Sequence, residues 1–453
     1  MISKLIKHFA VCVCLLTCSV CHIARGGVVL IRDSEIEDTL REILDQILEV
    51  AGIDKRAVKI YLISDRSVNA FATFEKRIFV CTGLLLKADK VEHIVGVLSH
   101  EIGHIACEHM IRHVGAAEQS KILSVALAIV GIGAGMAIGS PDLIMGGMMG
   151  GMAMGINTFL YYSRAEEEAA DNKAMDYMQK LGLSTKGLLE VIEMFALSAR
   201  LNIGEKGLPT THPGIEARVA YLRANVHLFE QTSVPRKIPP ETAQKCKRIR
   251  IKLEAYSKPV EKTLAKFPRN DCSTEALYAR AIALNKRGDF HGSIACMDAL
   301  ISKFPKDPYF LETKAQILYE NSRISEAVEL YRSLVALKRS DVLLNIAFAN
   351  ALIKSGDNRH LDEAQKVLNN ALIEDKSEPL AWYLMSIIYG KRGDYGTSAL
   401  MSAEGALVRG DERGAIAQAK RAIKYGLKNP IHLQRAKFIA KEKTPKAKGK
   451  PKT

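Results

Sequence analysis

Cysteine is scarce in most of this 453-residue chain. Four of the nine cysteines lie within the first 25 residues, and the other five are widely spaced, with no Cys-x-x-Cys pair among them. Such a pattern excludes a disulfide framework and a structural zinc site built from cysteines.

Uncharged runs long enough to cross a membrane are also rare. Lys4 and Lys7 precede an uncharged apolar run at 9–20, which is too short for a confident span, and small residues follow it. This order is typical of a secretory signal peptide, which we place at residues 1–24. We therefore expect a periplasmic protein, with membrane association through an uncleaved anchor as the alternative.

Acidic residues are outnumbered by basic ones, which gives a net charge of +14. The tail at 441–453 holds six lysines and one glutamate, a composition typical of a disordered segment. Because the signal peptide indicates a location outside the cytoplasm, we expect no nucleic-acid partner. Anionic lipid or surface polysaccharide is the expected counterpart of the tail, although most tails of this kind are merely solvated.

The run His100-Glu101-Ile102-Gly103-His104 is the most informative motif. Imidazoles four residues apart lie on one face of a helix, close enough to chelate one tetrahedral ion. Glu101 would then lie beside the metal and accept the proton of a bound water. Two helix histidines satisfied by core hydrogen bonds are the alternative, although the helix is apolar almost all round and buried histidines need partners. Gly103, between the histidines, would allow a neighbouring element to approach closely.

A third metal ligand is expected, because a catalytic zinc has three protein ligands and one open position. The best candidate segment is the acid-rich, helix-forming run Ser-Arg-Ala-Glu-Glu-Glu-Ala-Ala-Asp at 163–171. Glu167 and Asp171 are four residues apart on one helical face, so one can bind the metal while the other orients a histidine ligand. A solvated acidic helix face is the alternative.

The two motifs together resemble the HtpX and CAAX-prenyl-protease class of zinc metallopeptidases. The resemblance implies one zinc ion per chain held by His100, His104 and Glu167, with Asp171 outside them orienting a ligand. One position departs from the family pattern, whose second glutamate falls on Ala169.

Further motifs resemble the secreted, BepA-like branch of that class. They are Ser-Val-Asn-Ala-Phe at 67–71, His109, and Thr-His-Pro-Gly-Ile-Glu-Ala-Arg at 211–218. The resemblance places His212 near the metal, where it would touch zinc or, like Arg218, stabilise the oxyanion.

Two short strands are expected at 59–63 and 77–80, around a turn at 69–71, because these runs are rich in β-branched and apolar residues. An edge of this sheet beside the cleft would let an extended peptide add as a strand. A purely structural hairpin is the alternative.

The stretch at 122–162 carries a single charge in 41 residues, and 145–154 within it holds five methionines and four glycines. Three interpretations stay open: buried core, a mobile lid over the site, or a hairpin inserted into a membrane.

Helical repeats are expected in the second half of the chain. Turn-like pairs beginning at Gly288, Ser322, Gly356 and Gly393 recur at intervals of 34, 34 and 37 residues, a period typical of tetratricopeptide helix pairs. Stacked pairs leave a concave face that binds protein segments.

The fold class is therefore mainly α with a small β-sheet (α+β): a zincin-like metalloprotease domain followed by a tetratricopeptide α-solenoid. We expect a signal peptide (1–24), the protease domain (28–230), a linker and helix (231–270), the repeats (271–430) and a basic disordered tail (431–453).

The expected function is that of a zinc-dependent endopeptidase of the cell envelope whose repeats recruit its clients. By resemblance, those clients are unfolded or misassembled envelope proteins, outer-membrane proteins among them, and the outer-membrane assembly machinery is a further expected partner. The alternative is a chaperone-like scaffold or assembly factor with a dormant or tightly gated protease site.

Overall fold

The computed structural model describes residues 30–73, 75–109, 162–201, 212–226 and 236–441. They fall into two compact units, one ending at Phe310 and the other beginning at Leu311. The expected signal peptide, nearly all of the uncharged stretch and the lysine-rich end of the tail lie outside the described residues. The predicted domain limits stay a prediction.

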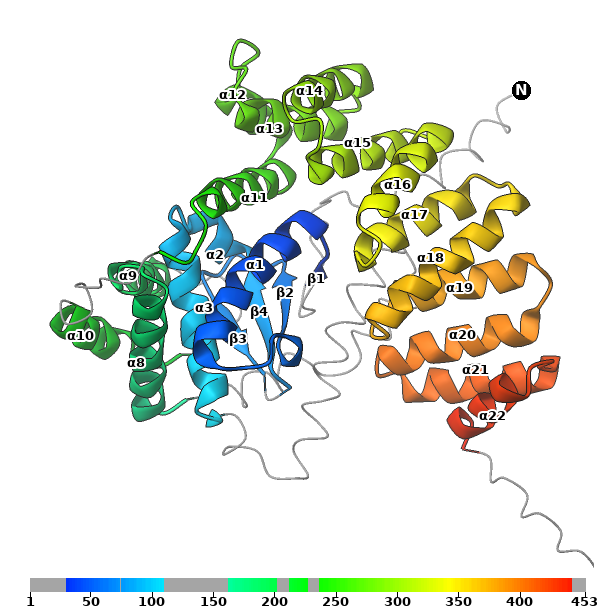
Figure 1. The fold of residues 1–453 in the computed structure, drawn as a ribbon, viewed down its shortest axis with the longest axis horizontal. Coiled ribbons are helices and arrows are strands. Elements are labelled where there is room, and N and C mark those ends of the chain that lie inside the picture. The colour runs from blue at the N-terminus through cyan, green and yellow to red at the C-terminus, as the bar shows by residue number, and fades with distance from the viewer. Residues whose placement is uncertain (1–29, 74, 110–161, 202–211, 227–235, 442–453) are drawn as a thin grey trace, which may run out of the picture. The chain divides into compact units, whose positions relative to one another are not determined.

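The first unit contains a four-stranded sheet with the order β1-β2-β4-β3 (Figure 1). The two expected strands are β2 (Lys59–Ile63) and β4 (Arg77–Cys81), and they pair in parallel. β1 (Leu30–Ile31) and β3 (Ala70–Ala72) are antiparallel edges. The predicted turn at 69–71 is therefore wrong, because most of it lies in the edge strand β3. After β2 the chain crosses to the far edge of the sheet, forms β3 there, and then turns back to form β4 between β2 and β3.

The centre of the first unit is α3 (Val91–Ala106), which is buried at nearly every position. Its apolar residues face α1 (Ser34–Ala51) on one side and α8 (Arg164–Lys180) and α9 (Lys186–Leu201) on others, and β3 lies beside it. The two histidines of the motif therefore lie inside the core. The remaining elements before the repeats are η1 (Lys55–Ala57), α2 (Thr82–Lys87), α10 (Ile215–Asn225), α11 (Glu241–Ser257) and α12 (Val260–Lys266).

Gly103 permits the closest approach between α3 and α8. A Cβ atom at this position would lie 2.8 Å from the carbonyl oxygen of Ala170 and 3.0 Å from its Cα. These are backbone atoms, which cannot rotate away as a side chain can. The expected close approach of a neighbouring element is confirmed, and that element carries the acidic run.

A largely buried ionic cluster joins α1 to α11 and to α13 (Thr274–Lys286). Glu35, at the start of α1, is fully buried and contacts Arg248 and Lys252 of α11 and the hydroxyl of Tyr278 of α13, the last at 2.7 Å. Lys252 also lies 2.7 Å from Asp33. The carboxylate of Glu35 has no contact with water, and it ties α13 to α1 through the Tyr278 hydroxyl and α11 to α1 through the two cations.

The predicted helical repeats are confirmed. Gly288, Gly356, Gly393 and Gly410 end their helices in the left-handed conformation, and Ser322 takes the same conformation at φ 62°. This conformation lets one helix fold back on the preceding one. The helices are α13 (Thr274–Lys286), α14 (Phe290–Lys303), α15 (Pro308–Glu320), α16 (Ile324–Leu337), α17 (Val342–Lys354), η3 (Asn358–His360), α18 (Leu361–Glu374), α19 (Pro379–Lys391), α20 (Tyr395–Val408), α21 (Glu412–Tyr425) and α22 (Pro430–Ile439).

Small residues sit where the repeat helices cross. Ala327, Ala364 and Ala415 are fully buried, as is Ser293. The hydroxyl of Ser293 donates to the Ala281 carbonyl at 2.8 Å, so the serine pairs its own polar group inside the helix pair.

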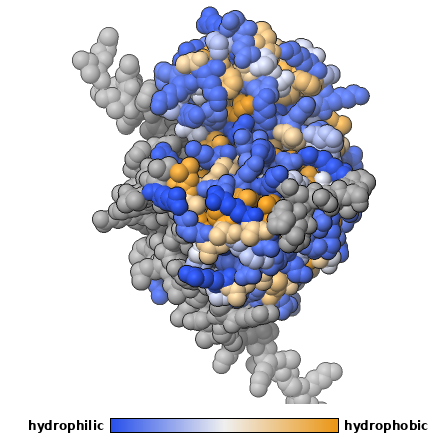
Figure 2. Space-filling view, turned by 90° about the vertical axis from the view of Figure 1, so that its left-hand side faces the viewer, coloured by the Kyte–Doolittle hydropathy of each residue, from blue (hydrophilic) through white to orange (hydrophobic). Residues whose placement is uncertain are grey.

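Within the described ranges, no helix is both long and apolar enough to span a bilayer. The face that carries α9 and α10 is mostly hydrophilic, with apolar side chains between (Figure 2). Leu197 of α9 is 56% exposed, and among the described residues of the first unit few other large apolar side chains face solvent.

Candidate metal centre

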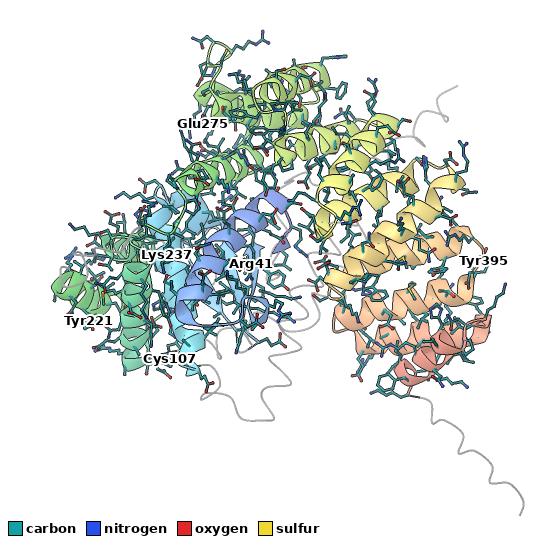
Figure 3. All side chains as sticks on the ribbon, viewed as in Figure 1. Arg41, Cys107, Tyr221, Lys237, Glu275 and Tyr395 are labelled. Atoms are coloured by element: carbon teal, nitrogen blue, oxygen red, sulfur yellow. The ribbon has the colours of Figure 1, made fainter. Side chains whose placement is uncertain are left out.

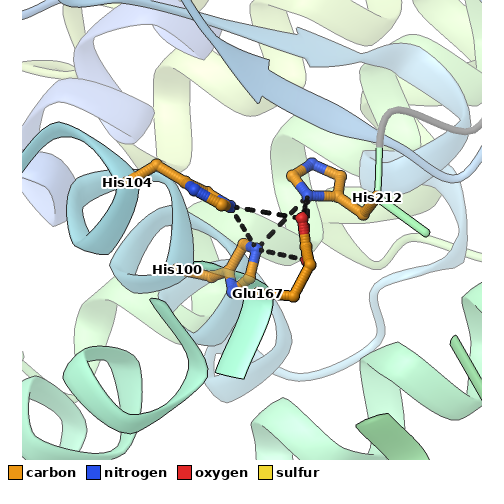
Figure 4. A group of neighbouring side chains, drawn as sticks. All are labelled: His100, His104, Glu167 and His212. Atoms are coloured by element: carbon orange, nitrogen blue, oxygen red, sulfur yellow. Dashed lines mark hydrogen bonds and ion pairs between the residues drawn. The ribbon is translucent and has the colours of Figure 1, made fainter. Parts of the chain in front are cut away.

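The helix α3 places His100 and His104 one turn apart with their rings directed to the same point (Figure 4). Their Nε2 atoms are 3.0 Å apart, and both side chains are buried. The spacing of the motif thus becomes a pair of nitrogen atoms that can share one ion.

The helix α8 brings Glu167 to the same point. Its Oε2 lies 3.4 Å from His100 Nε2 and its Oε1 lies 3.6 Å from His104 Nε2. The three adjacent glutamates have separate environments. Glu166 forms a capping box with Ser163, Glu167 is fully buried, and Glu168 is exposed. The Ser-x-x-Glu spacing of the capping box sets where α8 begins, and hence which glutamate points inward.

His212 completes the group from the segment before α10. Its Nδ1 lies 2.9 Å from Glu167 Oε1 and 3.4 Å from His100 Nε2, and its Nε2 lies 3.3 Å from the carbonyl oxygen of Ala70 in β3. Ligand atoms of these four buried side chains all lie within 4.8 Å of one another. Three imidazole nitrogens and a carboxylate are a donor set that suits zinc.

Asp171 and Arg218 lie behind the ligand group. Asp171 Oδ1 is 2.8 Å from His100 Nδ1, the ring nitrogen that faces away from the group. Arg218 of α10 donates two hydrogen bonds to the Asp171 carboxylate, at 2.7 and 2.8 Å, and its Nη1 lies 2.8 Å from Glu167 Oε2. These contacts direct the buried guanidinium at the two carboxylates.

The helix α10 is fixed on α8 by a polar contact outside the site. Tyr221, labelled in Figure 3, donates to Asn172 Oδ1 at 2.7 Å. Gly214 begins α10 in the left-handed conformation at φ 74°. These features place His212 and Arg218 together at the start of this short helix.

Glu101 points into the same space from α3. Its carboxylate is 1% exposed, and Oε1 lies 3.3 Å from His212 Nε2. Oε2 has no hydrogen-bond partner among the residues that the structure describes. A buried carboxylate oxygen without a partner is costly, and it is placed to accept a proton from a group that enters the site.

Neighbouring charges shift the pKa values of the buried groups of the site. Burial would raise the pKa of Glu167, but His212 and Arg218 hold the pKa of this carboxyl well below its usual range. Burial opposes protonation of His212, but Glu167 and Glu101 outweigh it and raise the pKa of His212 to about 10. Burial and the neighbouring His100 hold the pKa of His104 well below its usual range. The Glu167 carboxyl is therefore ionised at neutral pH.

Two residues of the site were not assigned a role from sequence. Tyr162 stacks on the ring of His104 with centroids 3.7 Å apart, and its hydroxyl is buried with no hydrogen-bond partner in the described part of the chain. His109 Nδ1 lies 2.9 Å from His104 Nδ1. In the sequence, the only signals that could have indicated these two residues were a histidine five residues after His104 and a tyrosine directly before Ser163.

Comparisons with known proteins agree with this arrangement. The model of the family described as Peptidase family M48 matches residues 34–226, and a tetratricopeptide repeat model matches residues 278–342. The beta-barrel assembly-enhancing protease of Escherichia coli K12 is 21% identical over 422 residues, which cover 92% of this chain and 84% of the relative. The protein of that name from Yersinia pestis is 19% identical over 429 residues, covering 92% and 85%. Metalloprotease YcaL of E. coli K12 is 32% identical over 170 residues, covering 37% of this chain and 61% of the relative.

Proposed function

Because this chain carries a peptidase family M48 domain followed by tetratricopeptide repeats, and is thus a zinc-dependent metalloprotease, we propose that it degrades unfolded or misassembled envelope proteins. Outer-membrane β-barrel proteins are the proposed clients, since the relatives that cover most of the chain are named for β-barrel assembly. The proposed location is the periplasm, reached through the signal peptide at 1–24.

The observation that carries the proposal is the convergence of four buried side chains beside a carboxylate with an unpartnered oxygen. We assign zinc binding to His100, His104 and Glu167, and the role of general base to Glu101. Asp171 accepts a hydrogen bond from His100 Nδ1 and so keeps the Nε2 lone pair of that ring directed at the ligand group.

Zinc bound there would act as a Lewis acid toward a water molecule and a peptide carbonyl. Glu101 accepts the proton of the attacking water and returns it to the leaving amine. Arg218 belongs with the positioning residues in this proposal, rather than with the oxyanion donors expected from sequence. Its contacts are directed at Asp171 and Glu167.

The substrate is proposed to bind as an added strand at β3. This strand is an edge of the sheet, and the carbonyl oxygen of Ala70 lies 3.3 Å from His212. Backbone pairing at such an edge holds an extended peptide with little sequence preference, which suits unfolded clients. The repeats would recruit those clients, and contacts with the assembly machinery or a membrane surface belong to the same proposal.

Removal of the metal tests the proposal as a whole. Full-length protein should cleave an unfolded outer-membrane β-barrel protein, lose that cleavage on chelation, and recover it when zinc is restored. Gel-based cleavage and the zinc content per chain are measured together. A protein that contains one zinc ion, binds the unfolded client and does not cleave it would instead support the scaffold with a dormant site.

His212 gives a specific reason to consider the gated alternative. A catalytic zinc keeps one open position, whereas this group offers a fourth protein ligand. We expect the His212→Ala variant to cleave an unfolded client severalfold faster than the unchanged protein, because the fourth position becomes accessible to water. Initial rates at matched zinc content measure this. A severalfold loss of activity would contradict the gate and support the oxyanion role expected from sequence.

A further inference from the structure

The end of α3 contains a strained turn that directs His109 back onto the helix. The helix ends at Ala106, and Glu108 adopts the left-handed conformation at φ 53°. For a residue with a side chain this conformation costs on the order of 1 kcal/mol. His109 follows and is 3% exposed. Strain of this kind gathers at functional sites, where the surrounding structure maintains it.

The two ring nitrogens of His104 face different partners. Nε2 faces the ligand group, 3.0 Å from His100 Nε2 and 3.6 Å from Glu167 Oε1. Nδ1 faces the other way and lies 2.9 Å from His109 Nδ1. A ring that offers the Nε2 lone pair to a cation carries its proton on Nδ1. His104 Nδ1 therefore donates to His109 Nδ1, which accepts.

This contact repeats the arrangement at the other histidine of the motif. His100 has its Nδ1 2.8 Å from a carboxylate oxygen of Asp171. The acceptor behind His100 is thus an acid on α8, and the acceptor behind His104 is an imidazole five residues further along the same chain segment. Acceptors of this kind fix the tautomer and the ring orientation of metal-binding histidines.

The face of the His104 ring is also covered. Tyr162 stacks on it with an interplanar angle of 16° and ring centroids 3.7 Å apart. His109 lies at 71° to the same ring, with centroids 5.1 Å apart. The stacked tyrosine opposes tilting of the imidazole, and the hydrogen bond that His104 Nδ1 donates to His109 opposes its rotation.

We propose that His109 is a positioning residue that sets the zinc affinity of the site by accepting the hydrogen bond from His104 Nδ1. The inference rests on the proposed zinc peptidase function and deepens it, because it assigns His109 a role that acts through His104. The strained turn at Glu108 serves to bring this acceptor into place.

The test compares two substitutions of His109 in the full-length chain. His109→Phe keeps a ring and removes the acceptor, and we expect it to raise the dissociation constant for zinc by about 10- to 100-fold. His109→Asn keeps an acceptor, since Oδ1 can take the place of Nδ1, and should stay within about threefold of the unchanged protein. Zinc affinity is measured by competition with a chromophoric chelator, and the cobalt-substituted protein gives an absorption spectrum that reports ligand geometry.

Controls separate positioning from folding. Glu108→Gly preserves the turn without its strain and should bind zinc like the unchanged protein. The melting temperature of each metal-free variant shows whether it folds.

The inference is overturned if the folded His109→Phe variant has the same zinc affinity and the same cobalt spectrum as the unchanged protein. That result would leave the proposed function intact. Equal weakening by Phe and Asn would also overturn it, because the acceptor would then not be the cause. If the unchanged protein binds no zinc, the proposed function itself fails.

Discussion

Replacing Glu101 with glutamine is expected to lower cleavage of an unfolded client by about 10²- to 10⁴-fold, the range that a general base contributes. Glutamine keeps the size of the side chain but cannot accept a proton at neutral pH. Zinc content should stay at that of the unchanged protein, because Glu101 is not among the four side chains that converge as ligands. The measurement pairs initial cleavage rates with metal analysis of the same samples.

Glu168→Gln provides the matched control. Glu168 is on α8 one residue from Glu167, but its side chain is exposed. The same chemical change there should leave both cleavage and zinc content unaltered. If Glu101→Gln cleaves at the rate of the unchanged protein with equal zinc, the peptidase assignment is wrong. If neither form cleaves while both bind the unfolded client, the scaffold alternative is favoured.

Replacing Glu35 with glutamine is expected to destabilise the first unit by about 3 kcal/mol, at the lower end of the range for breaking a buried ion pair. Glu35 is fully buried and contacts both Arg248 and Lys252. Removing its charge leaves Arg248 and Lys252 with less negative charge beside them. The expected loss is at the lower end of the range because Asp33 still contacts Lys252 at 2.7 Å and Asp307 still contacts Arg248 at 2.6 Å. The cluster stabilises the junction between α1 and α11.

The probe for this prediction must report on the first unit. The single tryptophan of the chain, Trp382, lies in α19 of the second unit, so its fluorescence does not report on α1. Hydrogen exchange of peptides from α1 and α11 measures the opening directly. A loss of 3 kcal/mol corresponds to about two decades of exchange rate. Unchanged exchange in these two helices would show that the cluster is energetically neutral.

Glu49→Gln on the same helix is the control. Glu49 pairs with Lys55 at 2.9 Å, but its side chain is 62% exposed. An exposed pair of this kind is screened by water and salt, so no measurable change in exchange is expected.

The Glu35 effect should also depend on pH. Burial raises the pKa of Glu35, but the charges of Lys252 and Arg248 outweigh it and lower the pKa in the folded state. A carboxyl whose folded pKa is lowered contributes stability that is complete above its unfolded pKa and is lost as the pH falls through the folded pKa. The difference between the unchanged protein and Glu35→Gln should therefore be largest near neutral pH and shrink in acid.

The features that follow from local geometry could be predicted from the sequence. The spacing of His100 and His104 follows from the 3.6-residue turn of a helix, and the inward direction of Glu167 follows from where Ser163 begins α8. The repeat turns follow from turn-like pairs at intervals of 34, 34 and 37 residues, because left-handed residues recur where each helix must reverse.

Other features needed contacts between distant segments. The parallel pairing of β2 and β4, and the edge position of β3, depend on a crossover that periodicity does not show. His212 reaches a histidine 112 positions away, and Arg248 reaches an acid 213 positions away. The contact of His109 with His104 spans five residues, yet it depends on a left-handed Glu108 that no propensity favours.

The sequence by itself determined which chemical groups this protein has: two histidines and a glutamate on one helix, an acidic side chain on another, and repeats that follow them in the chain. Helix periodicity and capping act over a few residues, so the order of amino acids is enough to set them. The tertiary structure decided how that chemistry is surrounded. It makes His212, which motif resemblance had placed near the metal, a fourth member of the site, and it directs Arg218 at the carboxylates. It also packs His109 and Tyr162 against His104. These arrangements depend on which buried surfaces pack together, and packing is decided by the whole core rather than by neighbours along the chain.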